Sequence, residues 1–141
     1  MIHFHHEMDI FPNDLSYMER NKYSKRYTLA YEAQVLTLEE LLSYLDKNKT
    51  LMVTIGRANC HHKDQFNKKL GRELATSRMQ KLPYILDHIQ SMDEKIIATF
   101  KLALEVDENG AIIFRDKQAV FQFQMIIYRD SNHARMRFFR D

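Results

Sequence analysis

The residues from Ile96 to Val106 alternate between apolar and polar side chains, and this pattern constrains the fold more than any other feature of the sequence. Apolar residues stand at every second position, and Thr99, Lys101 and Glu105 lie between them. A period of two is that of a β-strand with one face on a core and one face in water. Strands of this kind are typical of antiparallel sheets, because parallel strands are usually apolar on both faces.

The rest of the C-terminal third extends this strand into a predicted antiparallel meander. Asp107–Gly110 is a hairpin turn sequence. Val120–Arg129 is predicted to be a second alternating strand, followed by a turn at Asp130–Asn132 and a returning strand from Ala134 to Phe139. One face of the second strand is apolar, with Phe121, Phe123, Met125 and Ile127 at alternate positions.

The N-terminal half is predicted to supply further strands and a first helix. Ile2 and Phe4 alternate with histidines, which indicates a short strand, and Phe11–Asp14 indicates a turn. Tyr27–Leu36 is apolar and aromatic enough for another strand. Thr37 and Glu40 then form a capping box at the start of a helix. Its apolar face would consist of Leu38, Leu41, Leu42 and Leu45.

A strand, a polar loop and a basic helix follow in the middle of the chain. The sequence predicts a buried strand over Leu51–Ile55, a loop over Gly56–Lys63 and a helix from Asp64, its cap, to about Gln80. Phe66, Leu70 and Leu74 recur at helical spacing and are predicted to face the core. A second helical segment is predicted over Leu82–Ser91. The helix contains Gly71, which costs about 1 kcal/mol relative to alanine, so we expect another element to approach its backbone closely.

These elements predict an α+β fold in which an antiparallel sheet packs in two layers against two or three helices. The 141 residues are the usual size of one domain. The single cysteine, Cys60, excludes an internal disulfide and fits a reducing compartment. The sequence has no apolar run of membrane-spanning length and no secretory signal at its start. These features predict a cytoplasmic protein that does not associate with membranes.

Positive charge is concentrated in the middle of the chain. The net charge of the whole sequence is +2, whereas the segment from Arg57 to Lys81 carries seven basic and two acidic residues, a local charge of +5. A basic patch on an acidic remainder indicates an anionic partner. The alternative is an ordinary solvated helix face.

The predicted anion site lies where the helix follows the strand. The first turn of a helix exposes N–H groups whose dipoles favour an anion. Arginine grips a phosphate with two N–H groups, and lysine adds a point charge. The candidates for phosphate binding are Arg57, Lys63, Lys68, Arg72 and Arg78, and those for reading a base or a ribose are Gln65 and Asn67.

The sequence predicts no metal, no cofactor and no catalytic residue. Cys60, His61 and His62 are adjacent, and three adjacent ligands cannot easily converge on one tetrahedral ion. Cys60 as a nucleophile would need a cleft as well as a histidine. No pair of carboxylates stands out.

The C-terminal tail combines arginines with aromatic residues. Alternation directs Arg135, Arg137 and Phe139 to one side, where they could add charge and a stacking ring to a nucleic-acid site. The alternative is an edge strand whose arginines discourage aggregation. The same edge could join copies of the chain into a homo-oligomer.

The segment from Gly56 to Met79 resembles a pattern found in small proteins encoded by bacteriophages. In these proteins a strand leads into a cysteine-containing loop and a helix of the type KDQFNKKLGR, which stands here as Cys60 followed by Lys63–Arg72. The chain is also similar to the Thoeris anti-defence family, phage proteins that sequester a cyclic nucleotide signal of the host's immune system. This resemblance implies an α+β fold, no catalysis, location in the host cytoplasm and an arginine-lined ligand pocket between subunits of a homo-oligomer.

Three functions therefore remain open. The first is a non-catalytic phage protein that binds a phosphate-bearing, cyclic nucleotide and counteracts host defence. The second is a nucleic-acid-binding module that uses the basic helix and the tail. The third is a protein inhibitor of a host enzyme, for which the edge of the meander would be the contact. An enzyme is a further alternative, because the sequence does not show the shape of a pocket.

Overall fold

The computed structural model describes residues 1–8, 26–46, 48–59, 67–103, 105–106, 108–109, 112–113 and 120–138. In this part of the chain, eight strands form one sheet in which all neighbouring strands are antiparallel. Their order is β1-β2-β4-β5-β6-β9-β10-β3. The strands are β1 (Ile2–Met8), β2 (Arg26–Glu32), β3 (Val35–Thr37), β4 (Leu51–Asn59), β5 (Gln80–Ser91), β6 (Lys95–Leu102), β9 (Gln122–Tyr128) and β10 (His133–Arg137).

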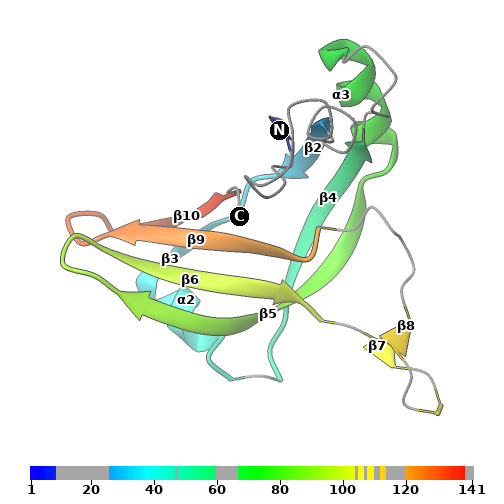
Figure 1. The fold of residues 1–141 in the computed structure, drawn as a ribbon. Coiled ribbons are helices and arrows are strands. Elements are labelled where there is room, and N and C mark those ends of the chain that lie inside the picture. Colours follow the sequence, from blue (N-terminus) through cyan, green and yellow to red (C-terminus); the bar gives the residue numbers. More distant parts are fainter. Residues whose placement is uncertain are drawn as a thin grey trace, which may run out of the picture.

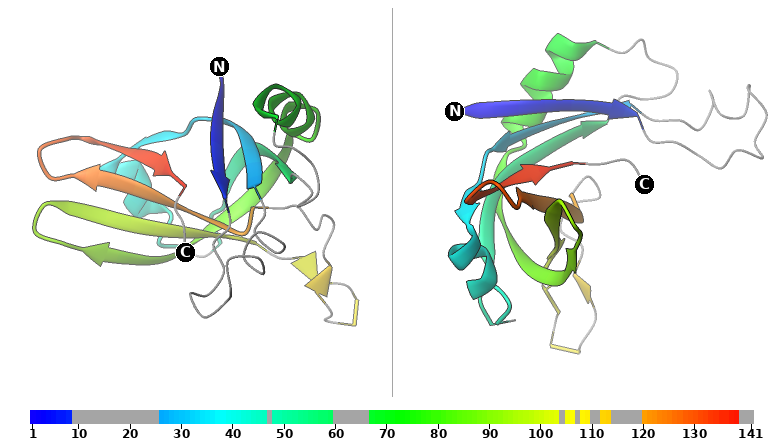
Figure 2. Two further views of the ribbon diagram at one scale, coloured as in Figure 1. Left: turned by 45° about the horizontal axis from the view of Figure 1, so that its top comes forward. Right: turned by 90° about the vertical axis from the view of Figure 1, so that its left-hand side faces the viewer.

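The sheet curls because β2 and β3 pair with different neighbours. Only Ala33 and Gln34 separate the two strands, yet β2 lies between β1 and β4 whereas β3 lies beside β10. The predicted strand over Tyr27–Leu36 is therefore two strands with a break between them. The backbone N–H of Gln34 donates to Met136 Sδ at 3.2 Å and ties this break to β10. Figures 1 and 2 show the resulting half-barrel.

The core fills the concave face of the half-barrel. The rings of Phe100 and Phe123 stack with centroids 5.2 Å apart, and Tyr84 meets Phe123 edge-on at 4.9 Å. The buried hydroxyl of Tyr84 donates to the carbonyl oxygen of Val120 at 2.6 Å. Burial also raises the pKa of Tyr84, since the charged phenolate would be desolvated. Burying one such ring stabilises the fold by roughly 1.5–3 kcal/mol.

The first helix is α2 (Leu38–Ser43), and its predicted capping box is confirmed. Thr37 Oγ1 accepts from the N–H of Glu40 at 3.1 Å, and Glu40 Oε1 accepts from the N–H of Thr37 at 3.2 Å. The predicted apolar face is wrong in part. Leu41 is buried in the core, but the helix is too short to cover more of it, so three leucines are exposed: Leu38, Leu42 and Leu45.

The second helix, α3 (Lys68–Ser77), packs on the convex face of β2 and β4. A small apolar contact of Ala30, Ala58 and Ala75, with Met79 beside it, joins the helix to the sheet. A Cβ atom at Gly71 would lie 2.5 Å from Thr28 Oγ1, so the predicted close approach to this glycine is confirmed.

The predicted core face of α3 is wrong. Leu70 and Leu74 are 52% and 37% exposed, because Gly71 and Ala75 face the sheet instead. The predicted cap is also wrong. Helix α3 begins at Lys68 and its N-cap is Asn67, whose Oδ1 accepts from the N–H of Leu70 at 3.2 Å. Asp64 and Phe66 lie outside the described residues.

Two predictions about the neighbouring strands are wrong as well. Strand β4 continues to Asn59, so the segment from Gly56 to Asn59 is not a loop. The predicted helix over Leu82–Ser91 is strand β5, whose inward residues Tyr84 and Leu86 are buried between the pairing strands β4 and β6.

The C-terminal meander is confirmed in part, because the predicted strand over Ile96–Val106 ends at Leu102 and Glu105–Val106 belongs to a separate two-stranded sheet. Strands β6, β9 and β10 pair in sequence, and a turn from Tyr128 to Ser131 joins β9 to β10. The predicted hairpin is also present, as the separate pair β7 (Glu105–Val106) and β8 (Ile112–Ile113). The solvent exposure of two side chains in this region differs from the sequence prediction. Thr99 is buried on the predicted wet face, and Phe121 is 48% exposed because it precedes β9.

The α+β class is thus confirmed as an antiparallel sheet with two helices in the described part of the chain. The helices lie at different places on the curled sheet, α2 beside β3 and α3 over β2 and β4. The arrangement in two layers stays a prediction. Phe11–Asp14, the predicted first turn, lies outside the described residues.

Candidate functional site

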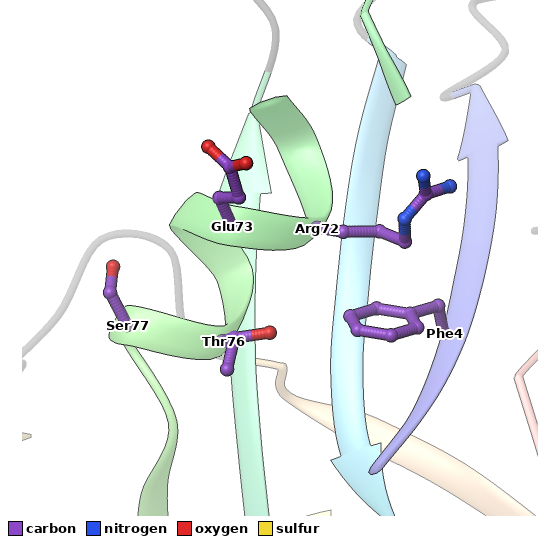
Figure 3. A pocket seen from close by; sticks show the side chains of 5 residues that line it. All are labelled: Phe4, Arg72, Glu73, Thr76 and Ser77. Carbon is purple, nitrogen blue, oxygen red and sulfur yellow. The ribbon is translucent and has the colours of Figure 1, made fainter. Parts of the chain in front are cut away.

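The candidate site is a surface shared by α3 and the convex side of β1, which we call the α3–β1 surface and define by Phe4, His6, Lys68, Arg72 and Thr76. Strand β1 pairs with β2 along seven residues, with His6 opposite Thr28 and Phe4 opposite Ala30. Because α3 lies on the same face of β2, the helix stands beside β1, and Figure 3 shows the side chain of Arg72 next to Phe4.

Thr28 connects the strand to the helix beneath this surface. Its side chain is fully buried, lies against Gly71 of α3 and hydrogen-bonds through Oγ1 to His6 Nδ1 at 2.8 Å. The imidazole of His6 is therefore held at a fixed place relative to the helix. A Cβ atom on Gly71 would meet this Thr28 side chain, so the glycine leaves room for the hydrogen bond between Thr28 and His6 beneath α3.

The positive charges of Lys68 and Arg72, both on α3, affect the same imidazole, that of His6. Desolvation lowers the pKa of His6 below its ordinary value, and the positive charges of Lys68, Arg72 and His5 lower it further. The imidazole of His6 is consequently held in its neutral form over more of the pH range. Only the part of this lowering that comes from Lys68 and Arg72 reflects positive charge that would attract an anion, because desolvation disfavours a charge of either sign.

An open groove of about 420 Å³ lies on this surface. It is lined by Phe4, Arg72, Glu73, Thr76 and Ser77. Figure 3 shows Arg72 and Thr76 extending from α3 toward the ring of Phe4, while Glu73 and Ser77 point away from it. The side of the groove next to β1 therefore combines a guanidinium, a hydroxyl and an aromatic ring.

Arg57 lies on the opposite face of the sheet. Alternation along β4 directs Gly56 toward α3, so the next residue, Arg57, points to the concave face. Its guanidinium carbon lies 4.2 Å from the centre of the Tyr27 ring, and its Nε donates to Asn59 Oδ1 at 2.7 Å. Arg57 and the pair Lys68 and Arg72 therefore lie on opposite faces of the sheet, so they cannot bind one anion together as the sequence predicted.

The remaining residues predicted on the basic helix have separate positions. Asn67 caps α3, and the hydrogen bond to Leu70 engages its side-chain oxygen. Arg78 is the C-cap residue, and its guanidinium donates to the carbonyl oxygen of Arg57 at 3.4 Å. Lys63 and Gln65 lie outside the described residues.

The tail arginines occupy another part of the sheet. Arg135 and Arg137 are exposed on β10, while Met136 and Phe138 pack on the core, which confirms the predicted alternation. The predicted edge position is wrong, because β10 pairs with β9 on one side and with β3 on the other. Phe139 lies outside the described residues.

The predicted cysteine and histidine cluster of Cys60, His61 and His62 also falls outside the described part of the chain. Within that part, no group of three His, Cys, Asp or Glu residues is arranged to hold a metal ion. Neither α2 nor α3, the helices that the structure describes, has the length and apolar character to cross a membrane.

Sequence reasoning missed the contribution of β1 to the site. Phe4 and His6 share one face of a predicted strand, which alternation alone could show. Nothing local in the sequence indicates that this strand lies beside a helix more than 60 positions later in the chain. The only distant signal is Gly71, whose cost within a helix requires a close neighbour.

Comparisons with known proteins found no family model and no curated protein that matches the sequence significantly, and no solved structure that matches the fold.

Proposed function

We propose that this protein binds a phosphate-bearing nucleotide on the α3–β1 surface without catalysing a reaction. The observation that carries the proposal is the groove in which the side chain of Arg72 extends toward the exposed ring of Phe4, with Lys68 one helical turn away on α3. These residues supply two needs of a nucleotide, a positive site for phosphate and a flat apolar surface for a base.

The phosphate would bind between the two cations of α3. The side chain of Arg72 extends over the groove and can donate two parallel N–H bonds to phosphate oxygens. Lys68 lies one helical turn earlier and adds a point charge. Glu73 points away from Phe4, so its carboxylate does not oppose an anion on the β1 side of the groove.

The base would stack on Phe4, whose side chain is 40% exposed. Stacking on an aromatic ring is worth about 1–3 kcal/mol per base and tolerates different bases. Thr76 can hydrogen-bond a ribose hydroxyl from the adjacent turn of α3. The groove volume of about 420 Å³ lies within the roughly 300–1,000 Å³ of small-ligand sites.

The biological role in this proposal is that of a phage protein that sequesters a cyclic nucleotide and so counteracts host defence. It rests on the resemblance of the strand, loop and basic helix to the anti-defence proteins. The sequence prediction included Arg57 among the phosphate-binding residues. Arg57 is not part of the binding surface proposed here.

A second candidate is nucleic-acid binding by the tail. It is favoured by Arg135 and Arg137, which are both exposed at alternate positions of β10 and so point to one side. Phosphate contacts of this kind would make affinity fall steeply with salt. Inhibition of a host enzyme remains the third candidate.

The proposal is tested by titrating the protein with linear and cyclic adenine and guanine nucleotides in a calorimeter. We expect heat of binding with at least one of them. Arg72→Ala should weaken that binding by about tenfold or more, because a hydrogen bond to a charged group contributes about 1.5–3 kcal/mol. Arg137→Ala is the matched control and should leave the affinity unchanged. No heat with any nucleotide, in a folded sample, would refute the proposal, and loss of affinity only in Arg137→Ala would favour the tail.

The pKa of His6 provides an independent readout of where the nucleotide binds. A bound phosphate offsets the charges of Lys68 and Arg72, so we expect the pKa of His6 to rise toward its ordinary value on saturation. Arg72→Ala without ligand should raise it as well. The imidazole proton resonances, followed by NMR from pH 5 to 8, measure both shifts. A saturating nucleotide that leaves the His6 titration unchanged would show that it binds elsewhere.

A further inference from the structure

Strands β6, β9 and β10 share a face that carries positive charge without carboxylates. They are neighbours in the sheet (Figure 1), and their inward residues belong to the core. The sequences of the three strands contain no Asp or Glu and four cations: Lys95, Lys101, Arg135 and Arg137. Alternation places all four on the convex face, away from the core. The sheet thus assembles a second cationic surface, on other strands than those under α3.

The register of the sheet brings an aromatic ring and an amide beside the two arginines of β10. Arg135 has Tyr128 and Gln124 as diagonal neighbours on the same face, and Gln124 lies opposite Arg137. Diagonal neighbours lie about 7–8 Å apart, within reach of rings and long side chains. On its other side, Tyr128 lies opposite Lys95 of β6. We call this group the meander surface and define it by Lys95, Gln124, Tyr128, Arg135 and Arg137.

The arginines and the ring of the meander surface are exposed to solvent. Tyr128 is 51% exposed, and Arg135 and Arg137 are exposed on β10. Neither arginine forms an ion pair with another described residue. Lys101 differs, because its Nζ lies 3.2 Å from Asp87 Oδ2, and it is therefore not counted in the surface. The three remaining cations favour an anionic partner.

We propose that the meander surface binds single-stranded nucleic acid, with phosphates on β10 and a base on Tyr128. Residues two apart on a strand are separated by about 6.6 Å, so Arg135 and Arg137 can each contact one of two successive phosphates. Each guanidinium can donate two N–H groups to phosphate oxygens. The exposed ring of Tyr128 stacks a base, and the amide of Gln124 offers a donor and an acceptor to a base edge.

The combination of cations, ring and amide selects an unpaired strand over other polyanions. In a duplex the bases stack on one another and their faces are covered, so an exposed ring on a sheet finds no stacking partner. An acidic peptide would engage the arginines and leave the ring and the amide without a role. Single strands use all three kinds of group, since bases stack on aromatic side chains beside a positively charged track for the backbone.

The acidic residues nearest to this surface indicate the direction of the bound strand. Three of them stand in the turns beyond Tyr128, namely Asp93, Glu94 and Asp130. The strand would therefore extend from Tyr128 toward Arg137. This inference rests on the second candidate function, nucleic-acid binding by the tail, and adds the ring, the amide and the cation of β6 to its two arginines. It does not involve the α3–β1 surface.

Binding is tested by the fluorescence anisotropy of labelled DNA and RNA strands of one mixed sequence, about 12 nucleotides long, titrated with the full chain. We expect both strands to bind, because the contacts are to phosphate and base. A duplex of the same sequence should bind several-fold more weakly, and poly-glutamate should compete poorly. Unchanged anisotropy with both strands would overturn the proposal, as would equal binding of the duplex or equal competition by poly-glutamate.

The two arginines are tested through the salt dependence of the affinity. Arg135→Ala/Arg137→Ala should weaken binding by about tenfold or more and reduce the slope of log affinity against log salt by about 1.4, since each phosphate contact to a single strand accounts for about 0.7. Lys69→Ala/Lys81→Ala is the matched control, because it removes the same charge from exposed positions outside the surface, and it should change the affinity much less. Equal weakening by both double variants would overturn the proposal.

Variants of Tyr128 separate base stacking from charge. Tyr128→Ala should weaken binding by about fivefold or more without changing the salt slope, whereas Tyr128→Phe should retain the affinity. Wild-type affinity in Tyr128→Ala would overturn the placement of a base on this ring. Failure of this inference appears as unchanged anisotropy with single strands, whereas failure of the α3–β1 proposal appears as an absence of heat with small nucleotides, so the two can be told apart.

Discussion

At the scale of single residues, two glycines decide how closely α3 approaches the sheet. At Gly56 an added Cβ would meet backbone atoms, the carbonyl oxygen of Ala75 and, at 2.7 Å, the nitrogen of Met79. At Gly71 it would meet only the side chain of Thr28. The backbone of α3 can yield only by moving as a whole, whereas a side chain can adjust locally.

We therefore predict that Gly56→Ala destabilises the protein by about 1–3 kcal/mol, the usual cost of overpacking. Gly71→Ala should cost less, because alanine improves helix propensity by about 1 kcal/mol and offsets part of the clash. Urea unfolding of the two variants, monitored by far-UV circular dichroism, gives both values. A larger loss for Gly71→Ala than for Gly56→Ala would contradict this description of the contact.

The same glycines explain what the sequence could show about the site. Gly56 indicated the start of a loop, and the predicted strand therefore ended at Ile55. Its true role is to admit α3, and β4 runs on to Asn59. If the predicted strand had been extended past Gly56, Arg57 would have followed Val53 and Ile55 at alternate positions and would have been assigned to the concave face. The charge excess was visible in the sequence, but the face on which each charge lies depends on this register.

At the scale of elements, the capping box of α2 is the feature that the sequence predicted most completely. Thr37 and Glu40 exchange two hydrogen bonds, and both residues are close in sequence, so no tertiary information was needed. Strand β5 shows the opposite case. Residues from Leu82 onward have a mixed pattern compatible with a short helix, and only the pairing with β4 and β6 selects a strand.

We predict that Thr37→Ala destabilises the protein by about 1 kcal/mol, because it removes the oxygen that accepts from the N–H of Glu40. Thr37→Ser should retain most of the stability, since serine keeps that hydroxyl. Chemical denaturation of both variants measures the difference. Equal losses for alanine and serine would indicate that the threonine methyl group, and not the cap, makes the contribution.

At the scale of the whole molecule, the described residues on the concave face of the curled sheet form one contiguous core. Buried side chains from β2, β3, β4, β5, β6, β9 and β10 join in a single cluster, and Leu41 of α2 belongs to it. The sequence predicted the strands of the meander but not the curl. The curl depends on the break after β2 and on the pairing of β3 with β10, which are distant in sequence.

Because the core is continuous, we expect it to unfold as one unit, with coincident transitions by far-UV and near-UV circular dichroism. Phe123→Ala should lower the free energy of unfolding by about 3–5 kcal/mol. Phe123 is fully buried and contacts Phe100, Tyr84 and Phe138, which belong to three other strands or their ends. Both probes should shift together. Tyr128→Ala is the matched control, since Tyr128 lies on the same strand and is 51% exposed, and should change stability much less. Separate transitions in Phe123→Ala would show that the β2–β4 region with α3 is stable without the meander, and that the half-barrel consists of two cooperative units.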